Sequence, residues 1–327
     1  LVFRAFHALP PMKMSNGQVI NAAYGFFNML LGLIDEHHPD YLAVSFDLKG
    51  PTFRKEMFDA YKANRQKTPE ELLTQFPLIK EALHTLGIPI LEVQGYEADD
   101  VIGTVVKKAD QAGIHAYIVT GDRDSLQLIT DTTNVLLTRK GVSETELYDR
   151  SHLREVYGLE PKQIIDLKGL MGDASDNIPG IKGVGEKTAL KLLAEFGSIS
   201  NLYDNLDGLP NNKMKEKIVA GKESAFLSLK LATIVTDVPI SFQLEDLVFT
   251  GLENSALYQA LSTLEFSSIL KRLGLKEPAE QGSEPEVLSL RQAENLQELM
   301  ALAEEKKRLA ICQVENTLYF AVGEEKE

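Results

Sequence analysis

Hydrophobic and polar positions in the first part of the chain alternate between two periods. Residues 18–37 carry apolar side chains at helical spacing, and residues 41–46 form a short apolar run typical of a buried strand. The alternation continues, with further helices expected over 72–86 and 98–111 and further strands over 88–93, 115–120 and 134–138. Strands that alternate with amphipathic helices predict an α/β fold with a doubly wound, mostly parallel sheet.

The pattern changes near residue 151, where strand-like runs stop and helical patterns continue to about residue 275; the expected helices include 151–157, 161–171, 187–196 and 212–219. Residues 276–286 hold two prolines and four glutamates, which is typical of a linker. The last part contains one helical pattern, 290–305, and two strand-like runs, 309–313 and 318–322. We expect four parts: an α/β domain over 1–150, a helical domain over 151–275, the linker, and the beginning of a truncated domain over 287–327.

Composition narrows the class of protein. The chain has 327 residues, a single cysteine, Cys312, and no apolar run near the roughly 20 residues that cross a bilayer, which favours a reducing cytoplasm. Its first residues show neither an initiator Met nor a signal-peptide layout, so we expect the natural start to lie upstream. A net charge of −14 argues weakly against nucleic acid. Local basic stretches at 54–67 and 182–191 argue for it.

Acidic side chains gather where the strands of the predicted sheet end. Ligands of doubly wound sheets bind beyond the carboxyl ends of the strands, and so many acids in one place would repel each other without cations between them. For any one of these acidic clusters taken alone, a purely structural role as a helix cap is the simpler explanation. Hard oxygen ligands without a cysteine or histidine cluster favour Mg²⁺ or Mn²⁺ over zinc. The predicted metal ligands are Asp47, Glu97, Asp99, Asp100, Asp122, Asp124, Asp173 and Asp176.

A glycine-rich stretch, Gly180–Thr188, is the second candidate site. It superficially matches a phosphate-binding loop, but Glu186 stands where that motif requires lysine and no strand precedes it. A tight turn between two helices, whose backbone amides meet a DNA phosphate, fits better than a purely structural helix hairpin. The residues expected to contact DNA are Arg54, Tyr61, Gly180, Lys182, Gly183, Gly185, Lys187 and Thr188.

Several motifs together resemble the 5′ nuclease domains of bacterial DNA polymerase I, which belong to the flap endonuclease family. The resemblance covers about residues 1–275 and is carried by Arg4–Phe6, Phe46-Asp47, Thr52–Arg54, Tyr61–Arg65, Tyr96–Asp100, Thr120–Asp124, Leu167–Gly180 and Gly183–Ala189. It implies a PIN-like, resolvase-like fold with a helical arch, followed by an all-α domain with a helix-three-turn-helix motif.

The resemblance also implies roles for residues. The eight acids match those that hold two metal ions, and Lys62 and Arg65 match arch cations that close on the scissile phosphate as catalytic groups. The stretch Gly180–Thr188 matches the hairpin that grips duplex DNA and often holds K⁺. A first strand with a further acidic ligand is expected before Leu1. The tail resembles the start of a 3′–5′ exonuclease domain without the D-x-E metal motif near residues 310–315, which indicates a vestigial version.

The expected function is a structure-specific 5′ nuclease that cuts DNA at 5′ flaps and nicks by a two-metal mechanism in replication and repair. Its expected partners are flapped, nicked or gapped duplexes and RNA/DNA 5′ ends of the Okazaki type, with no membrane. We expect a monomer in the bacterial cytoplasm that continues into a polymerase. Two alternatives remain open: a non-catalytic module that binds DNA junctions, and an RNA-processing nuclease of a related metal-dependent fold.

Overall fold

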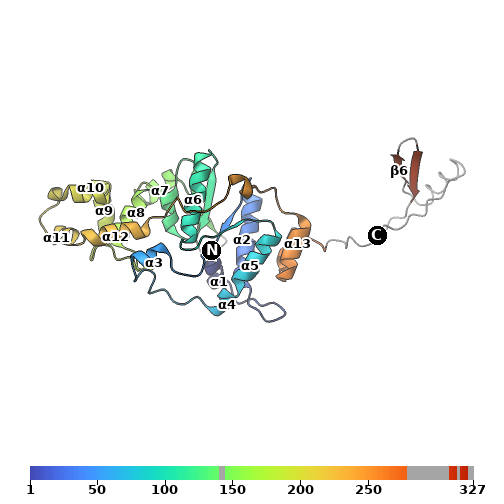
Figure 1. Ribbon diagram of the computed structural model, residues 1–327, viewed down its shortest axis with the longest axis horizontal. Coiled ribbons are helices and arrows are strands. Elements are labelled where there is room, and N and C mark those ends of the chain that lie inside the picture. Colours follow the sequence, from blue (N-terminus) through green and yellow to red (C-terminus); the bar gives the residue numbers. More distant parts are fainter. Residues whose placement is uncertain (140–143, 278–308, 315–316, 323–327) are drawn as a thin grey trace. The chain divides into compact units, whose positions relative to one another are not determined.

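The computed structural model describes residues 1–139, 144–277, 309–314 and 317–322. The chain forms two compact units, Leu1–Glu277 and Pro278–Glu327 (Figure 1). In the second unit, β6 (Leu309–Val314) pairs antiparallel with β7 (Thr317–Val322), which confirms the expected strand pair. The expected helix 290–305 and nearly all of the expected linker lie outside the described residues.

The strands of the first unit form two short sheets. β1 (Val44–Ser45) pairs parallel with β2 (Ile90–Leu91), and β3 (Ala116–Thr120) pairs parallel with β4 (Thr133–Thr138). An antiparallel strand that the sequence pattern did not predict, β5 (Thr145–Tyr148), extends the second sheet beside β4. Within residues 1–139 and 144–277 no strand joins β1 to β3, so the expected single sheet is divided at this point.

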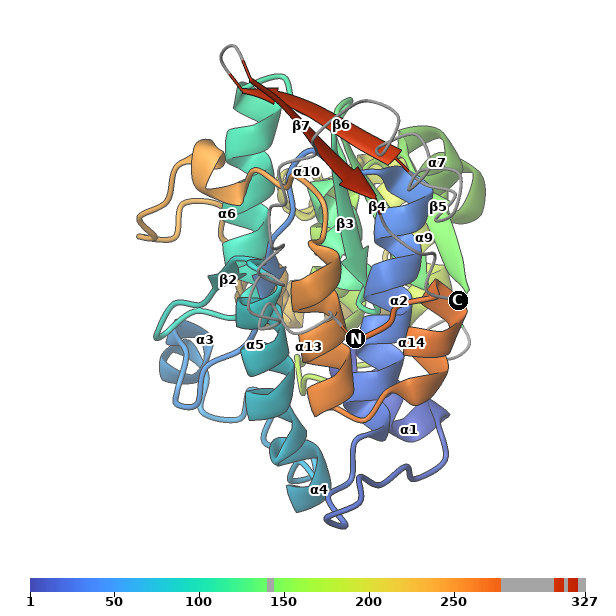
Figure 2. The ribbon, with the colours of Figure 1, turned by 90° about the vertical axis from the view of Figure 1, so that its right-hand side faces the viewer.

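One hydrophobic core lies around the first sheet. Its helices are α1 (Val2–Ala8), α2 (Asn21–His37), α5 (Gln75–Thr85), α13 (Asn254–Thr263) and α14 (Ser267–Leu273). Phe27, Leu83, Leu261 and Phe266 are fully buried there, and α13 lies alongside α2 and α5 (Figure 2). The last helices of the unit thus return to the first core instead of packing in the helical domain.

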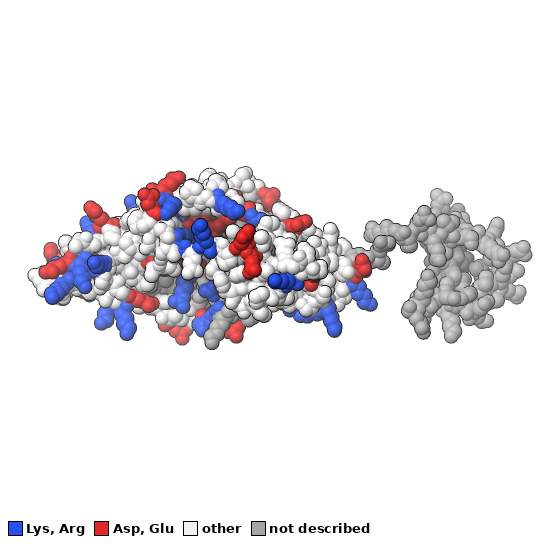
Figure 3. All heavy atoms as spheres, turned by 90° about the horizontal axis from the view of Figure 1, so that it is seen from below, with Lys and Arg blue, Asp and Glu red and all other residues white. Residues whose placement is uncertain are grey.

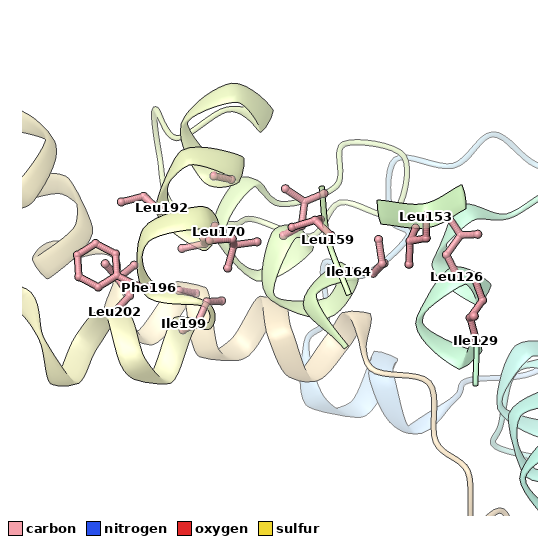
Figure 4. Close-up of a cluster of buried hydrophobic side chains, with 14 of the residues drawn as sticks. Leu126, Ile129, Leu153, Leu159, Ile164, Leu170, Leu192, Phe196, Ile199 and Leu202 are labelled. Atoms are coloured by element: carbon pink, nitrogen blue, oxygen red, sulfur yellow. The ribbon is translucent and has the colours of Figure 1, made fainter. Parts of the chain in front are cut away.

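A second core joins the other sheet to the helical part. The helices are α7 (Arg150–Tyr157), α8 (Gln163–Met171), α9 (Glu186–Phe196), α10 (Ile199–Asp204), α11 (Lys213–Ala220) and α12 (Lys222–Ala232). Leu126 and Ile129 share this core with Leu153, Ile164 and others as far as Leu202 (Figure 4). The core therefore crosses residue 150, where the sequence pattern changes.

The first unit also contains shorter elements. They are α3 (Phe53–Met57), α4 (Glu70–Leu73), and the 3₁₀ turns η1 (Arg123–Leu128), η2 (Leu206–Gly208) and η3 (Leu244–Leu247). Between α3 and α4, where the resemblance implies a helical arch, residues 58–69 form turns and extended chain, because this polar stretch offers no apolar face at helical spacing. None of the helices described has the length and apolar character required to cross a membrane.

Candidate metal centre and nucleic-acid interface

The first group of acids lies where β1 ends and α6 (Ala98–Gln111) begins. Asp47 follows β1, and its Oδ1 accepts a hydrogen bond from the Ala98 amide at 2.8 Å. Glu97 caps the helix, so Asp99 projects from its first turn. Burial, followed by the negative charges of Asp122 and Asp47, raises the pKa of Asp99 to about 7. Carboxylates from three separate segments are therefore close enough to repel one another.

The second group follows β3. Asp122 begins the 3₁₀ turn η1 and accepts a hydrogen bond from the Asp124 amide at 3.0 Å. The ammonium of Lys168, on α8, lies 2.6 Å from Asp124 Oδ1 and also pairs with Asp173. Burial and the charge of Asp122 raise the pKa of Asp124 to about 6 despite that lysine. At Asp173, burial is outweighed by hydrogen bonds from Lys168 and Ser175, and the pKa falls to about 2.

A closed loop over residues 172–180 carries the last two acids. Its ends meet at Gly172 and Gly180, which have φ angles of +75° and +60°. A Cβ atom on Gly180 would clash with the Gly172 nitrogen, so both the backbone conformation and the close approach require glycine. The Asp173 and Ile178 backbones pair within the loop, which directs Asp173 and Asp176 toward the other acids.

Two cations from the segment after α3, Lys62 and Arg65, contact acids of the cluster. Lys62 Nζ lies 2.7 Å from Glu97 Oε1, and Arg65 pairs with Asp176. The Tyr61 hydroxyl donates to Glu97 at 3.2 Å and lies 3.4 Å from an Asp176 oxygen. Burial and these two carboxylates raise the pKa of Tyr61, so it remains a neutral donor. The two cations predicted to act on the phosphate thus lie beside the acids.

Asp100 and Arg54 form a separate buried ion pair. Asp100 is fully buried, and both of its oxygens accept hydrogen bonds from the Arg54 guanidinium at 2.7 Å. The amides of Glu97 and Val235 supply two more hydrogen bonds to Asp100. These four contacts leave no accessible oxygen for a metal ion. Arg54 is only 3% exposed, so its side chain is not available to DNA.

The remaining seven acids suit a hard cation chemically. Within residues 1–139 and 144–277, no three His, Cys, Asp or Glu side chains already enclose a cation site. Lys62 and Lys168 lie between acids instead, and Arg65 pairs with Asp176. Asp124 Oδ1 is buried and lies against the Lys168 ammonium without an aligned hydrogen bond, and burial, followed by the charges of Asp122 and Asp47, raises the pKa of Asp99. A divalent cation bound by oxygen would satisfy both groups.

The glycine-rich hairpin exposes most of its predicted DNA contacts. Lys182, Gly183, Gly185 and Lys187 are exposed, and Thr188 is half-buried in the first turn of α9. Gly180 is buried, with its N–H and C=O bonded to Ser228 and Ser224, so it is closed to a phosphate. Tyr61 is also buried. Seen from below, acidic side chains lie in a hollow near the middle of the first unit, with basic side chains at its rim (Figure 3).

Two residues of the site were not among the predicted ones. Lys168 is one of two charged positions, with Asp166, among the apolar residues Ile164, Ile165, Leu167 and Leu170 of α8, and a lysine in this largely apolar helix was the available signal. Gln127 bonds to backbone groups on both sides of the site, at Asp124 and at residues 232 and 234. Nothing in the sequence distinguishes it from an ordinary polar residue.

The architecture defines a class: a resolvase-like α/β nuclease fold followed by a helical domain. Two family profiles match in succession, the N-terminal resolvase-like domain of 5′-3′ exonucleases over residues 1–158 and their C-terminal SAM-fold domain over 159–255. The chain belongs to this 5′-3′ exonuclease family.

Relatives within the family are DNA polymerases I. That of Caldicellulosiruptor bescii is 46% identical over 279 residues, which cover 85% of this chain and 33% of the relative. The chain thus spans about a third of the length of this polymerase.

Solved structures with the same fold include two from phage T5. Zinc-bound T5 5′-exonuclease aligns with a TM-score of 0.57 at 28% identity, covering 64% of this chain and 80% of the other. A complex of the T5 D15 flap endonuclease with DNA and metal ions aligns with a TM-score of 0.57 at 25% identity, covering 76% and 90%. The expected fold class is confirmed.

Proposed function

We propose that this chain is the 5′ nuclease part of a DNA polymerase I, and that it hydrolyses DNA phosphodiesters at 5′ flaps and nicks with two divalent cations, Mg²⁺ or Mn²⁺. The observation that carries the proposal is the convergence of seven acids from four separate segments beside Lys62 and Arg65. Relatives with this fold include a flap endonuclease crystallised with DNA and metal ions.

Different acids would bind each of the two cations. Asp47, Asp99 and Asp122 would hold one ion, Asp124 and Asp173 would hold the other, and Glu97 and Asp176 would complete the set through water. Bound divalent cations supply a hydroxide nucleophile at neutral pH and neutralise the leaving oxygen. Asp100 takes no part as a ligand, because Arg54 and two amides occupy its oxygens.

Lys62 and Arg65 orient the phosphate and offset its charge. In the protein without DNA they pair with Glu97 and Asp176, and Lys62 is about a quarter exposed while Arg65 is half exposed. A phosphate that enters beside these acids offers the same cations a closer anionic partner. The side chains therefore need only rotate from carboxylate to phosphate.

The hairpin holds the duplex next to the reacting bond. Lys182 and Lys187, with the amides near Gly183 and Gly185, contact phosphates without reading bases, so binding depends on shape and not on sequence. Hairpin carbonyls would hold K⁺. We further propose that the protein works as a monomer in the bacterial cytoplasm, that a polymerase domain follows, and that the second unit is the start of a vestigial 3′–5′ exonuclease.

One observation favours a second candidate, a module that binds DNA junctions without cutting them. Cations already lie between the acids, and Lys168 in particular neutralises Asp124 and Asp173 without any metal. If the lysine kept this place in the presence of Mg²⁺, the second ion would be excluded and cleavage lost.

Replacement of Asp122 by Asn separates the two candidates. Asn keeps the oxygen that caps η1 but removes a charge beside Asp99. We expect flap cleavage in Mg²⁺ to fall by roughly 10³-fold while the Kd for the flap stays within about twofold. Asp131→Asn, at a side chain 86% exposed, is the matched control and should leave both unchanged. Cleavage by Asp122→Asn at the normal rate would refute the metal assignment, and a natural protein that binds flaps without cutting them would establish the junction-binding module.

A further inference from the structure

The end of α12 and the extended chain that follows it are held by side chains from α3, α6 and η1. This connector, residues 231–235, has five backbone groups bonded to only three side chains. Arg54 donates to the carbonyls of residues 231 and 233 at 2.9 and 2.7 Å. Gln127 donates to the carbonyl of residue 232 at 3.0 Å and accepts from the amide of residue 234 at 2.8 Å. Asp100 accepts from the amide of residue 235 at 2.9 Å.

Each of those three side chains also lies on, or bonds to, an element that carries predicted ligands. Arg54 lies on α3, before the segment with Lys62 and Arg65. Asp100 lies next to Asp99 and bonds to the Glu97 amide at the start of α6. Gln127 lies in η1 and donates to the carbonyl of Asp124 at 2.9 Å. The connector is therefore positioned by the same backbone that positions the acids.

The other side of α12 fixes the glycine-rich hairpin. Ser228 is fully buried and accepts from the Gly180 amide at 2.9 Å, while Ser224 donates to the Gly180 carbonyl at 2.6 Å. Helix α8 packs closely against α12, since a Cβ on Gly169 of α8 would lie only 3.2 Å from the Ala225 carbonyl oxygen. The 11-residue helix α12 thus bonds to the hairpin through side chains along its length. Through the connector at its C-terminal end it is bonded to the elements that carry the acid cluster.

The geometry points to α12 and the connector as a rigid strut that fixes the distance between the hairpin and the acid cluster and so decides which phosphodiester is cut. The inference rests on the proposed function. Arg54 and Gln127 are positioning residues in this account, because they reach DNA and metal only through the elements they hold. A small displacement of reacting groups costs orders of magnitude in rate, so looser clamps would spread the cut over neighbouring bonds.

Gln127→Ala in the full-length protein tests the strut. On a 5′-flap substrate mapped at single-nucleotide resolution, we expect the natural protein to cut mainly one bond. The variant should cut neighbouring bonds as well, with the rate at the main bond reduced roughly tenfold. Mn²⁺ binding measured without DNA should be unchanged, because no predicted ligand is altered.

Gln75→Ala is the matched control. Gln75 is fully buried and also makes three hydrogen bonds, but two of these join α5 to α2 and one joins it to α4, and all leave the connector untouched. It should lose stability without changing the cleavage pattern. Ser228→Ala loosens the other end of the strut and should spread the cuts as Gln127→Ala does, which covers the case in which the first variant folds poorly.

Hydrogen exchange gives a measurement that does not depend on cleavage. In Gln127→Ala, the amides of residues 234 and 235 and of the hairpin residues 180–184 should exchange faster, and those of α2 should not. Natural exchange at the hairpin together with a single sharp cut would overturn the strut. If the natural protein cut nothing in the same assay, the proposed function would fall, and the exchange pattern would still decide whether the strut exists.

Discussion

The acid cluster has two halves that balance their charge in opposite ways. Asp47, Asp99 and Asp122 crowd together with Lys62 as the opposing charge, and burial with this repulsion raises the pKa of Asp99 to about 7. Asp124 and Asp173 have the Lys168 ammonium between them, and the pKa of Asp173 is lowered to about 2. The comparison teaches that carboxylates of one cluster can either repel one another beside a lysine or share a lysine that lies directly between them.

The difference has a consequence for the order of metal binding. A divalent ion at the first half relieves a repulsion, whereas an ion at the second half must compete with a lysine. We therefore expect the first half to bind its ion more tightly in the protein without DNA.

Of the variants that test the difference between the two halves, Lys168→Met should have the largest effect on the free energy of unfolding. It leaves two partly buried acids as uncompensated neighbours, and we expect a loss of about 2–3 kcal/mol in the free energy of unfolding without metal. Saturating Mg²⁺ should restore more of that stability in the variant than it adds to the natural protein, because a vacated position is available to the ion. Urea unfolding with EDTA and with Mg²⁺ measures both quantities.

Lys80→Met is the control for that measurement. Lys80 pairs with the single carboxylate of Glu92 at 2.5 Å, and its side chain is 29% exposed against 17% for Lys168. Its loss should cost less and should not depend on Mg²⁺. Equal Mg²⁺ effects in the two variants would show that Lys168 does not occupy a cation position.

A smaller effect should appear in the pH dependence of stability. Asp99 has a pKa near 7 when folded, against an ordinary value of 3.8, so the folded protein binds an extra proton between these values. Its stability without metal should fall as pH rises from about 4 to about 7, by at most about 1.4 kcal/mol per pH unit. Asp173 acts with the opposite sign, because its stabilisation is present above pH 3.8 and is lost as pH falls through about 2.

Unfolding at a series of pH values in EDTA checks the sign for Asp99. Asp99→Asn should remove the slope between about pH 6 and 7 and reduce it between pH 4 and 6, where Asp124, with a pKa of about 6, contributes with the same sign; Mg²⁺ should remove the slope in the natural protein. An Asp99→Asn protein with an unchanged slope would place the titration elsewhere.

Much of the first unit could be predicted because local and global signals agree there. Helix α6 has the expected bounds, Ala98–Gln111, since Glu97 and Asp100 form a capping box before an apolar period. The meeting of Asp47, Asp99 and Asp122 was expected from the rule that parallel strands bring their carboxyl ends to one edge, and it holds although β1 and β3 belong to separate sheets. For these residues, the position in the sequence was sufficient to predict the position in the structure.

Other features depend on contacts that no local pattern encodes. The sequence predicted that Arg54 contacts DNA and that Asp100 binds metal. In the structure the two side chains form a buried ion pair, although they are 46 residues apart in the chain. Helix α13 reads as part of the helical domain, yet it packs on α5. Both depend on how distant segments meet, and the change of pattern at residue 150 does not mark a boundary between cores.

The most direct test of the central claim is the number of divalent ions that the natural protein binds without DNA. We expect Mn²⁺ titration followed by electron paramagnetic resonance to show two sites, a tighter one lost in Asp122→Asn and a weaker one strengthened in Lys168→Met. Binding of no Mn²⁺, or identical binding by the natural protein and Asp122→Asn, would contradict the account.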